Sequence, residues 1–506
     1  MLTNENKLHE IIQNIWMHKE CEDRDMILKE KYEQYYTSSS IANYMASFFN
    51  NTKKKDIRML DPGAGFGSLT IAVVLATFKW KVKPKTIHAI LYEIDITVKY
   101  QLEFVMEELV KVSHEKNINF SWEVRYCDFI EDGVIRIKNK NTELFDYVIL
   151  NPPYRKLAAD SIENRWLLDI GIDSSNFYAA FVSLAKRSLI YNGELVAITP
   201  RSFCNGVYFN KYRSDIKADL SFVNIHLFDS RTSQFRKDDV LQETIIYHCI
   251  KEEWDDNKNV KIIYSTDDAF SDLISQDMKL SKLIYPADQN NTIRIVKNDE
   301  DKLVSNKIES LPCSLNDLNI QVSTGPVVDF RENKELLSKE VVKGSVPFLC
   351  SNHIKEGMIK WPLPWAKHNS LIPDEKSMKK LRPTGNYVLV KRISSKEEKR
   401  RVVCAIVQGE KYDTNFIAFD NKTNYFHRNK SGMDLDLAAG IYIYLSSSIV
   451  DMYFRIFSGH TQVNATDLRG IKFPDEKTLK ELGEYDFSEL QTQQDIDNLV
   501  EKVIFD

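Results

Sequence analysis

Short apolar runs alternate with helical segments from Ile57 to about residue 250, and this alternation most constrains the fold. Helical periodicity fills most of the gaps between runs, as in the stripe from Val98 to Leu109. This order predicts an α/β fold whose mainly parallel sheet is covered on both faces. The last two runs lie close together, which predicts a hairpin and one antiparallel edge strand. The predicted strands are 57–60, 87–93, 122–127, 146–150, 194–199, 223–228 and 243–250.

Two amphipathic helices are expected before the first strand. Apolar residues recur at helical spacing from Leu8 to Trp16, and again from Ile41 to Phe49 after a serine cap. The region 1–255 is therefore predicted to be one domain with N-terminal helices.

The chain changes character after residue 255. Residues 256–310 are polar and weakly periodic, and we interpret them as a connector with some helix. A second, α+β domain is predicted over 311–506, with β-like runs at 387–393 and 401–407 and a helical pattern at 437–457. A length of 506 residues suits this division, because domains usually have roughly 100–200 residues.

Composition excludes several classes of protein. With 43% hydrophobic residues, 17 Gly and 14 Pro, the chain is neither disordered nor fibrous. The seven cysteines form no C-x-x-C pair, which argues against a zinc site or a disulfide framework. The N-terminus has no secretory signal, and the longest apolar stretch, 69–78, is too short for a bilayer. We therefore expect a cytoplasmic protein with no metal and no membrane partner.

A glycine-rich turn follows the first predicted strand, in LDPGAGFGSL (60–69). Asp61 ends the strand, and Gly63, Gly65 and Gly67 precede a helix. Glycines allow close approach of the backbone to a ligand, and a helix N-terminus offers free N–H groups. Such a loop is also compatible with an ordinary tight turn.

Acidic residues end the next two predicted strands. Glu93 is placed to accept both hydroxyls of a ribose, and Asp128 to accept an adenine amino group. Each alone is more simply explained as a helix cap or a solvated turn residue. Together with the glycine loop they indicate a nucleoside-bearing cofactor at the ligand edge of an α/β sheet.

The fourth predicted strand runs directly into Asn151-Pro152-Pro153-Tyr154. The side-chain oxygen of Asn151 and the carbonyl of Pro152 make a paired acceptor for an NH₂ group, and Tyr154 offers a face for stacking a base. A conjugated amine is a poor nucleophile, and two acceptors on its hydrogens favour a nitrogen whose lone pair can attack a methyl sulfonium. A proline-stiffened turn is the plainer explanation, but it does not account for the position after a cofactor loop.

These motifs resemble those of the gamma class of S-adenosylmethionine-dependent DNA adenine methyltransferases, the modification enzymes of type II restriction systems. The corresponding segments are EQYYTSSSIANYM (33–45), LDPGAGFGSL (60–69) and NPPY (151–154), with weaker likeness in QVSTGPVVDF (321–330) and GHTQVNATDLRGIKFP (459–474). The resemblance implies a Rossmann-like class I methyltransferase domain followed by a target-recognition domain. Only short connectors separate the cofactor loop from NPPY, so the recognition domain must follow both.

The resemblance also implies roles for single residues. Thr37 would hold the carboxylate of S-adenosyl-L-methionine, although Glu33 and Ser38 depart from the family's usual Gly and Pro around it. The other implied cofactor contacts are Asp61, Gly63 and Gly65 for the methionine, Glu93 for the ribose, and Asp128 and Phe129 for the adenine.

The implied substrate is an adenine in a short duplex sequence, with a cognate restriction endonuclease sharing the site. A stacked base is inaccessible, so we expect it to flip into the pocket. Asn151, Pro152, Pro153 and Tyr154 would bind it, and Phe235 would form a second aromatic wall. Stacking on aromatic residues contributes about 1–3 kcal/mol per base, which helps to offset flipping. Neither a metal nor a general base is required.

The C-terminal half is expected to contact DNA, although the formal charge of the whole chain is −5. Residues 351–430 have 17 basic against 8 acidic residues, whereas 475–506 have 3 against 10, so the total averages two opposite regions. A basic run is often only a solvated face, but beside this domain DNA-backbone contact is favoured. The candidate contacts are Lys391, Arg392, Arg400, Arg401, His460, Gln462 and Asn464.

Several alternatives remain open. Pro-Asp-Glu-Lys occurs at 373–376 and 474–477, but each cluster is better explained as a helix start than as a nuclease site. The amine acceptor could instead belong to cytosine, RNA or a protein glutamine. A catalytically silent DNA-binding regulator is a further alternative, against which the intact Asn151 and Tyr154 argue.

Overall fold

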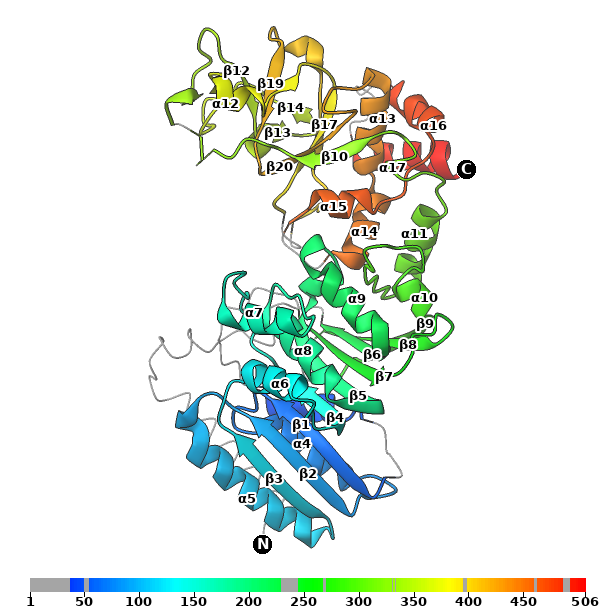
Figure 1. Cartoon of the computed structure of the whole chain (residues 1–506). Helices are drawn as coiled ribbons and strands as arrows, with labels where there is room; N and C mark the ends of the chain where they lie inside the picture. The colour runs from blue at the N-terminus through cyan, green and yellow to red at the C-terminus, as the bar shows by residue number, and fades with distance from the viewer. Residues whose placement is uncertain are drawn as a thin grey trace. The chain divides into compact units, whose positions relative to one another are not determined.

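The computed structural model describes residues 37–49, 54–228, 244–266, 270–329, 331–332, 334–394, 398–458, 462–485 and 492–506. The helix predicted from Leu8 to Trp16 lies outside these ranges. Contacts divide the chain into two compact units, Met1–Arg294 and Ile295–Asp506 (Figure 1). This boundary falls inside the segment that we interpreted as a connector.

The first unit is built on one nine-stranded sheet with the order β3-β2-β1-β4-β5-β7-β6-β8-β9. Neighbours from β3 to β5 pair in parallel, and β7 pairs antiparallel with both β5 and β6. The strands are β1 Asp56–Pro62, β2 Thr86–Tyr92, β3 Asn119–Arg125, β4 Phe145–Leu150, β5 Leu189–Pro200, β6 Leu220–Phe228, β7 Thr244–Lys251, β8 Asn259–Ser265 and β9 Ile274–Lys279. The sequence therefore predicted a strand at each of the first seven positions.

Two expectations about this sheet were wrong. The antiparallel strand β7 lies inside the sheet, because β6 returns beside it and β8 adds to β6 in parallel. Residues 259–265 and 274–279, expected in a connector, form β8 and β9, which pair antiparallel at the far edge. The alternation of polar and apolar residues is weak in β9 because that strand is largely exposed, whereas β8 is largely buried and was missed although its residues alternate. An exposed edge strand gives little hydrophobic signal in a sequence.

Helices cover both faces of this sheet. One face carries α3, α4 and α5, whose apolar side chains share one core with the strands, and Figure 1 shows α6, α8 and α9 on the other face. The helices are α3 Ser39–Ala46, α4 Ser68–Thr77, α5 Lys99–Glu115, α6 Phe129–Lys138, α7 Ile162–Asp169, α8 Phe177–Arg187, α9 Asn210–Asp219 and the short α10 Leu280–Leu283. The fold is therefore the Rossmann-like α/β arrangement that the alternation predicted.

Helix α3 is attached to the sheet by both apolar and polar contacts. Ile41 and Met45 are buried in the shared core. The Tyr44 hydroxyl lies 2.6 Å from His226 Nδ1 on β6, and His226 Nε2 lies 3.0 Å from Ser265 Oγ on β8. Ser38 caps the helix, since its Oγ accepts from the Ile41 N–H at 3.3 Å, as the sequence predicted.

His226 is expected to make the first unit sensitive to acid. Burial lowers the pKa of His226 from 6.5 to about 3. The folded state therefore binds fewer protons than the unfolded chain between these two pH values. The contribution of the neutral His226 side chain to the free energy of unfolding is complete above pH 6.5 and is lost as the pH falls toward 3. By pH 4 the loss should be roughly 3 kcal/mol. Thermal melting of the wild type and of His226→Gln across pH 7 to 4 tests this; equal pH slopes would contradict it.

The second unit is α+β. A six-stranded sheet has the order β10-β20-β17-β18-β14-β13, and a five-stranded sheet has the order β11-β15-β12-β19-β16. The longer strands are β10 Gln321–Thr324, β12 Val346–Leu349, β17 Tyr387–Lys391, β18 Cys404–Val407, β19 Phe416–Phe419 and β20 Thr423–His427. The two-residue strands are β11 Leu337–Ser338, β13 Ile354–Lys355, β14 Met358–Ile359, β15 Ser370–Leu371 and β16 Arg382–Pro383. The runs predicted at 387–393 and 401–407 thus correspond to β17 and β18.

The helical pattern predicted over 437–457 is two helices, α13 and α14, bent by 61° where Ser446 and Ser447 cap them. Gly440 lets α16 approach α13, because a Cβ there would lie 1.7 Å from the Leu479 carbonyl oxygen. Within the described ranges no single helix is long and apolar enough to cross a membrane, and only this bent pair meets that criterion jointly. The helices of this unit are α11 Asp299–Glu309, α12 Glu375–Met378, α13 Leu435–Leu445, α14 Ser448–Phe457, α15 Ala465–Arg469, α16 Glu476–Gly483 and α17 Gln493–Val500.

Candidate active site

The glycine loop is fastened to the end of β2. The N–H groups of Gly63 and Ala64 donate to the Tyr92 carbonyl at 2.9 and 2.8 Å, and the Gly65 N–H donates to Glu93 Oε2 at 2.7 Å. Gly63 and Gly65 have φ of 84° and 56°, in the left-handed region that favours glycine. The loop therefore holds its shape through hydrogen bonds to the neighbouring strand.

Gly67 caps α4 with φ of 78°, and its hydrogen faces α5. A Cβ at this position would lie 2.6 Å from Met106 Cε and 3.1 Å from Leu102 Cδ1. The third glycine is thus needed for helix packing, whereas the first two shape the loop.

Glu93 is buried, with 5% of its surface exposed. One carboxylate oxygen accepts from Gly65, and the other accepts from the Asp95 N–H at 2.7 Å. The side chain also lines the cavity described below. Its predicted ribose contact stays a prediction, and the structure adds a second task, which is to clamp the glycine loop.

Asp128 is the N-cap of α6, as the plainer explanation had it. Its Oδ1 accepts from the N–H groups of Ile130 and Glu131 at 2.7 and 3.1 Å. Asp128 nevertheless lines the same cavity as Phe129. The Phe129 ring packs against the Phe181 ring with centroids 5.1 Å apart. A cap and a cofactor contact are compatible here, since the cap uses one oxygen.

Asn151 follows β4 and makes a hydrogen bond at each end of its amide. Its Nδ2 donates to Thr37 Oγ1 at 3.0 Å, and its Oδ1 accepts from the Tyr154 hydroxyl at 3.0 Å. The structure thus brings together two residues 114 positions apart in the sequence.

Tyr154 does not present an open stacking face. Only 8% of its surface is exposed, and its ring packs edge-on against Tyr178 with centroids 6.4 Å apart. The prediction that the Tyr154 ring offers an open face for stacking a base is therefore wrong for this structure, because the ring is covered and the hydroxyl contacts Asn151. Phe235, the predicted second wall, lies outside the described residues.

These elements enclose a cavity of about 450 Å³ at the carboxyl ends of the parallel strands, a volume typical of small-molecule sites. The predicted residues on its wall are Thr37, Gly63, Gly65, Glu93, Asp128, Phe129, Asn151 and Pro153. The other predicted site residues of this region, Asp61, Pro152 and Tyr154, are not among the residues that line it. Sequence reasoning missed Phe66, Ile94, Arg155, Glu163, Phe177 and Phe181. Arg155 directly follows NPPY, and its guanidinium lies 3.8 Å from the centroid of the Phe177 ring. Phe177 and Phe181 are four residues apart on α8, a spacing that alone indicates only core.

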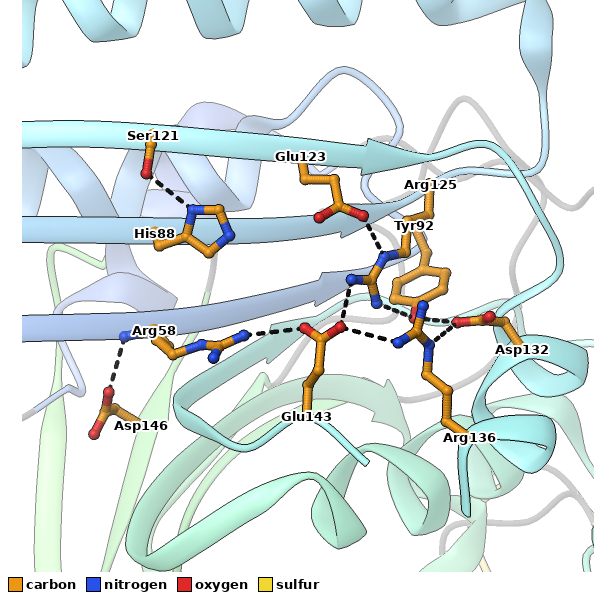
Figure 2. A network of polar contacts seen from close by, with 10 residues as sticks. All are labelled: Arg58, His88, Tyr92, Ser121, Glu123, Arg125, Asp132, Arg136, Glu143 and Asp146. Atoms are coloured by element: carbon orange, nitrogen blue, oxygen red, sulfur yellow. Dashed lines mark hydrogen bonds and ion pairs between the residues drawn. The ribbon is translucent and has the colours of Figure 1, made fainter. Parts of the chain in front are cut away.

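A polar network behind the cavity fixes the Tyr92 side of the wall (Figure 2). The Tyr92 hydroxyl donates to Asp132 Oδ2 at 2.5 Å and accepts from Arg125 Nη1 at 2.8 Å. Glu143 accepts from Arg125, Arg136 and Arg58 at 2.6, 2.9 and 3.0 Å. The network joins β1, β2, β3 and α6, so it holds the Tyr92 ring against Phe129 with centroids 5.0 Å apart. Nothing in the local sequence pattern indicated it, because its members come from five separate segments.

The predicted DNA contacts in the second unit divide into accessible and inaccessible residues. Arg401 is only 1% exposed; its Nε donates to Ser394 Oγ at 3.1 Å, and its guanidinium lies over Phe454. This burial contradicts the predicted DNA contact. Arg400 Nη2 donates to the Ser447 carbonyl at 2.9 Å, and its Nη1 bonds to Gln493, so that side chain is also held internally.

The remaining candidates have mixed positions. Lys391 pairs with Glu398 at 3.2 Å, and Arg392 Nη1 donates to the Asn421 carbonyl at 3.2 Å. Gln462 is exposed, and its backbone forms an isolated antiparallel β-bridge with Ile393. Asn464 is the N-cap of α15 and bonds to Asp467, which contradicts a free base-reading amide. His460 lies outside the described residues.

The two Pro-Asp-Glu-Lys clusters begin helices, as predicted. Asp374 caps α12 by accepting from the Ser377 N–H at 2.7 Å, and Asp475 caps α16 by accepting from the Thr478 N–H at 2.9 Å. Their acidic residues are therefore explained as helix starts.

The glycine loop, Glu93, Asp128 and Asn151 lie at one edge of a mainly parallel sheet, where open α/β sheets bind their ligands. Residues 68–235 match the family described as Eco57I restriction-modification methylase. Over 487 residues the chain is 40% identical to the type II methyltransferase M.PstI of Providencia stuartii, covering 94% of this chain and 93% of that protein. It is 39% identical over 488 residues to the type II methyltransferase M.BsuBI of Bacillus subtilis, covering 94% and 95%. The chain belongs to the type II methyltransferases of restriction-modification systems.

A more distant likeness exists to the solved structure of a DrdV–DNA complex. The identity is 12% and the TM-score 0.47, over 90% of this chain and 57% of that chain.

The cofactor of these methyltransferases is S-adenosyl-L-methionine, and an unsatisfied buried atom fits its amino-acid portion. Asp61 is fully buried; its Oδ2 accepts from the N–H and the hydroxyl of Thr70 at 3.2 and 2.7 Å, while Oδ1 has no hydrogen-bond partner among the described residues. Burial raises the pKa of Asp61 to about 7. A carboxylate kept from its charged form in this way suits a cationic group, and the amino-acid portion of the cofactor carries an ammonium.

Cofactor affinity is therefore expected to rise with pH. With the pKa of Asp61 at about 7, the charged form becomes dominant only above neutrality, so binding should tighten roughly 5- to 10-fold from pH 6 to 7.5. Isothermal titration with S-adenosylmethionine over this range measures it. Asp61→Asn should bind more weakly and with little pH dependence; a variant with the wild-type slope would contradict the assignment.

Proposed function

We propose that this protein methylates the exocyclic amine of adenine in a short duplex DNA sequence, which protects that sequence from a cognate restriction endonuclease. The observation that carries the proposal is the placement of Asn151 on the wall of the cofactor cavity, at the carboxyl end of β4. Membership of the type II methyltransferases supports a restriction-modification role. The Asn-Pro-Pro-Tyr motif supports adenine as the acceptor.

The side chains of the protein supply positioning and polar contacts. Asn151 Oδ1 and the Pro152 carbonyl would accept the two N–H hydrogens of the amine, which reduces the conjugation of its lone pair with the ring. When bound, S-adenosylmethionine supplies a methyl group on a positively charged sulfur. The amine held by Asn151 and Pro152 would bond to that methyl group as the bond from methyl to sulfur breaks, and it would then lose one proton to solvent. Alignment of the reacting atoms is the main catalytic contribution in such a scheme.

Removal of the Asn151 amide should abolish transfer without removing the cofactor. Asn151→Ala is expected to lower methyl transfer by at least roughly 100-fold, because the acceptor for the amine is lost. S-adenosylmethionine affinity should remain within about threefold, since Asn151 supplies one part of a long cavity wall. Transfer of labelled methyl to mixed-sequence duplex DNA, followed by digestion to nucleosides, measures both activity and acceptor.

The digestion separates the competing acceptors. Labelled N6-methyladenine supports the proposal. Labelled methylcytosine would show that the methyl acceptor is cytosine and not adenine, and label found only in RNA or protein would overturn a DNA function. Full activity of Asn151→Ala would show that the assignment of Asn151 is wrong.

Lys391, Arg392 and Gln462 are proposed to contact DNA, while Arg401 serves stability. Lys391→Gln should weaken DNA binding and reduce the slope of log affinity against log salt by about 1. Arg401→Gln should instead lower the free energy of unfolding by roughly 2–4 kcal/mol, because buried hydrogen bonds and packing on Phe454 are lost. Fluorescence anisotropy and chemical denaturation on both variants test the contrast; the same loss of DNA affinity without loss of stability in Arg401→Gln would contradict it.

A further inference from the structure

The orientation of the Asn151 amide is a chemical requirement of the proposed function. Oδ1 and Nδ2 are similar in size, so the side chain fits its site in two orientations related by a half-turn about the terminal bond. Only one of them presents an acceptor to the target amine. The reversed amide would direct N–H groups at an amine and repel it, so some neighbouring group must select the orientation.

Thr37 contacts the end of the amide that must face away from the base. Its Oγ1 accepts from Asn151 Nδ2 at 3.0 Å, and Thr37 is 7% exposed. The opposite end of the amide takes a hydrogen bond from the Tyr154 hydroxyl at 3.0 Å. An amide oxygen has two lone pairs, so Oδ1 can accept from more than one donor. A phenol is a better donor than acceptor, so Tyr154 favours the same orientation.

The position of Thr37 is fixed independently of Asn151. It immediately precedes Ser38, the N-cap of α3, and α3 is anchored by Met45 in the core and by Tyr44 at His226. Thr37 is thus carried by a helix docked on the sheet, whereas Asn151 extends from the end of β4. A buried hydroxyl at a fixed position is suited to orienting a flexible amide.

We propose that Thr37 is a positioning residue for Asn151: by accepting from Nδ2, it holds Oδ1 toward the target amine. This inference rests on the proposed function, since it assumes that Asn151 binds the amine. It differs from the role implied by family resemblance, in which Thr37 holds the cofactor carboxylate. The two roles are compatible, because the Thr37 hydroxyl can donate its proton to the cofactor carboxylate while its oxygen accepts from Asn151 Nδ2. A hydroxyl that donates to a carboxylate can act toward Nδ2 only as an acceptor.

Three variants separate these roles. Thr37→Val keeps the shape but cannot accept a hydrogen bond, and Thr37→Ser restores the hydroxyl. Ser38→Ala is the matched control, since it removes the cap at the same helix end and leaves the Thr37 hydroxyl in place. Single-turnover methyl transfer at saturating S-adenosylmethionine should fall roughly 10- to 100-fold in Thr37→Val, and should stay within about threefold of wild type in the other two. Melting temperatures of all three show whether the fold is retained.

A binding measurement without turnover gives the second readout. With S-adenosylhomocysteine present and an abasic nucleotide opposite the target, so that base pairing does not differ, the wild type should bind a duplex with adenine at the target more tightly than one with an amine-free purine. Thr37→Val should lose this discrimination, and it should add nothing further in an Asn151→Ala background, since both act through one amide.

The outcomes distinguish the inference from the function on which it rests. If the wild type neither methylates adenine nor discriminates against the amine-free purine, the proposed function fails. If it does both and Thr37→Val behaves as wild type, the positioning role is overturned. A Thr37→Val variant that only weakens S-adenosylmethionine binding, by the same factor with and without Asn151, would assign Thr37 to the cofactor alone.

Discussion

The clamp between Glu93 and the glycine loop is the interaction on which the rest of the site depends. Glu93 directly follows β2, and its two carboxylate oxygens accept from the N–H groups of Gly65 and Asp95. Backbone N–H groups that would otherwise be unpaired inside the protein are satisfied by one buried carboxylate. Because the glycine loop and the turn after β2 meet at this side chain, one carboxylate joins two parts of the cavity wall.

The two units differ in how they use charge. In the first unit, arginines are bound into a network with Glu143 and Asp132 that supports the wall of the cavity from behind (Figure 2). In the second unit, part of the basic run is likewise held by internal partners, as Arg401 and Arg400 show. A count of lysines and arginines therefore overstates the positive charge that is available to a polyanion.

Much of the fold and part of the site could be predicted from the sequence. Periodicity located β1 to β7 because most of those strands contain a buried apolar run, and it failed for β9, whose side chains are mostly exposed. Motif spacing located Glu93 and Asn151 because strand ends meet at one edge of a parallel sheet. It could not show that Tyr154 is covered or that Arg401 is buried. Each depends on which distant side chain lies opposite, and local pattern does not contain that information.

The attachment of α3 to β6 sets the smallest fragment that can retain the complete site. Strands β1 to β5 already contain the glycine loop, Glu93 and Asn151, and a fragment ending after β5 would include every cofactor-facing motif of the sheet. It would lack His226, the polar partner of Tyr44, and with it an anchor for the helix that carries Thr37. Any split or minimised version of this enzyme must therefore include β6 and its neighbours β7 and β8.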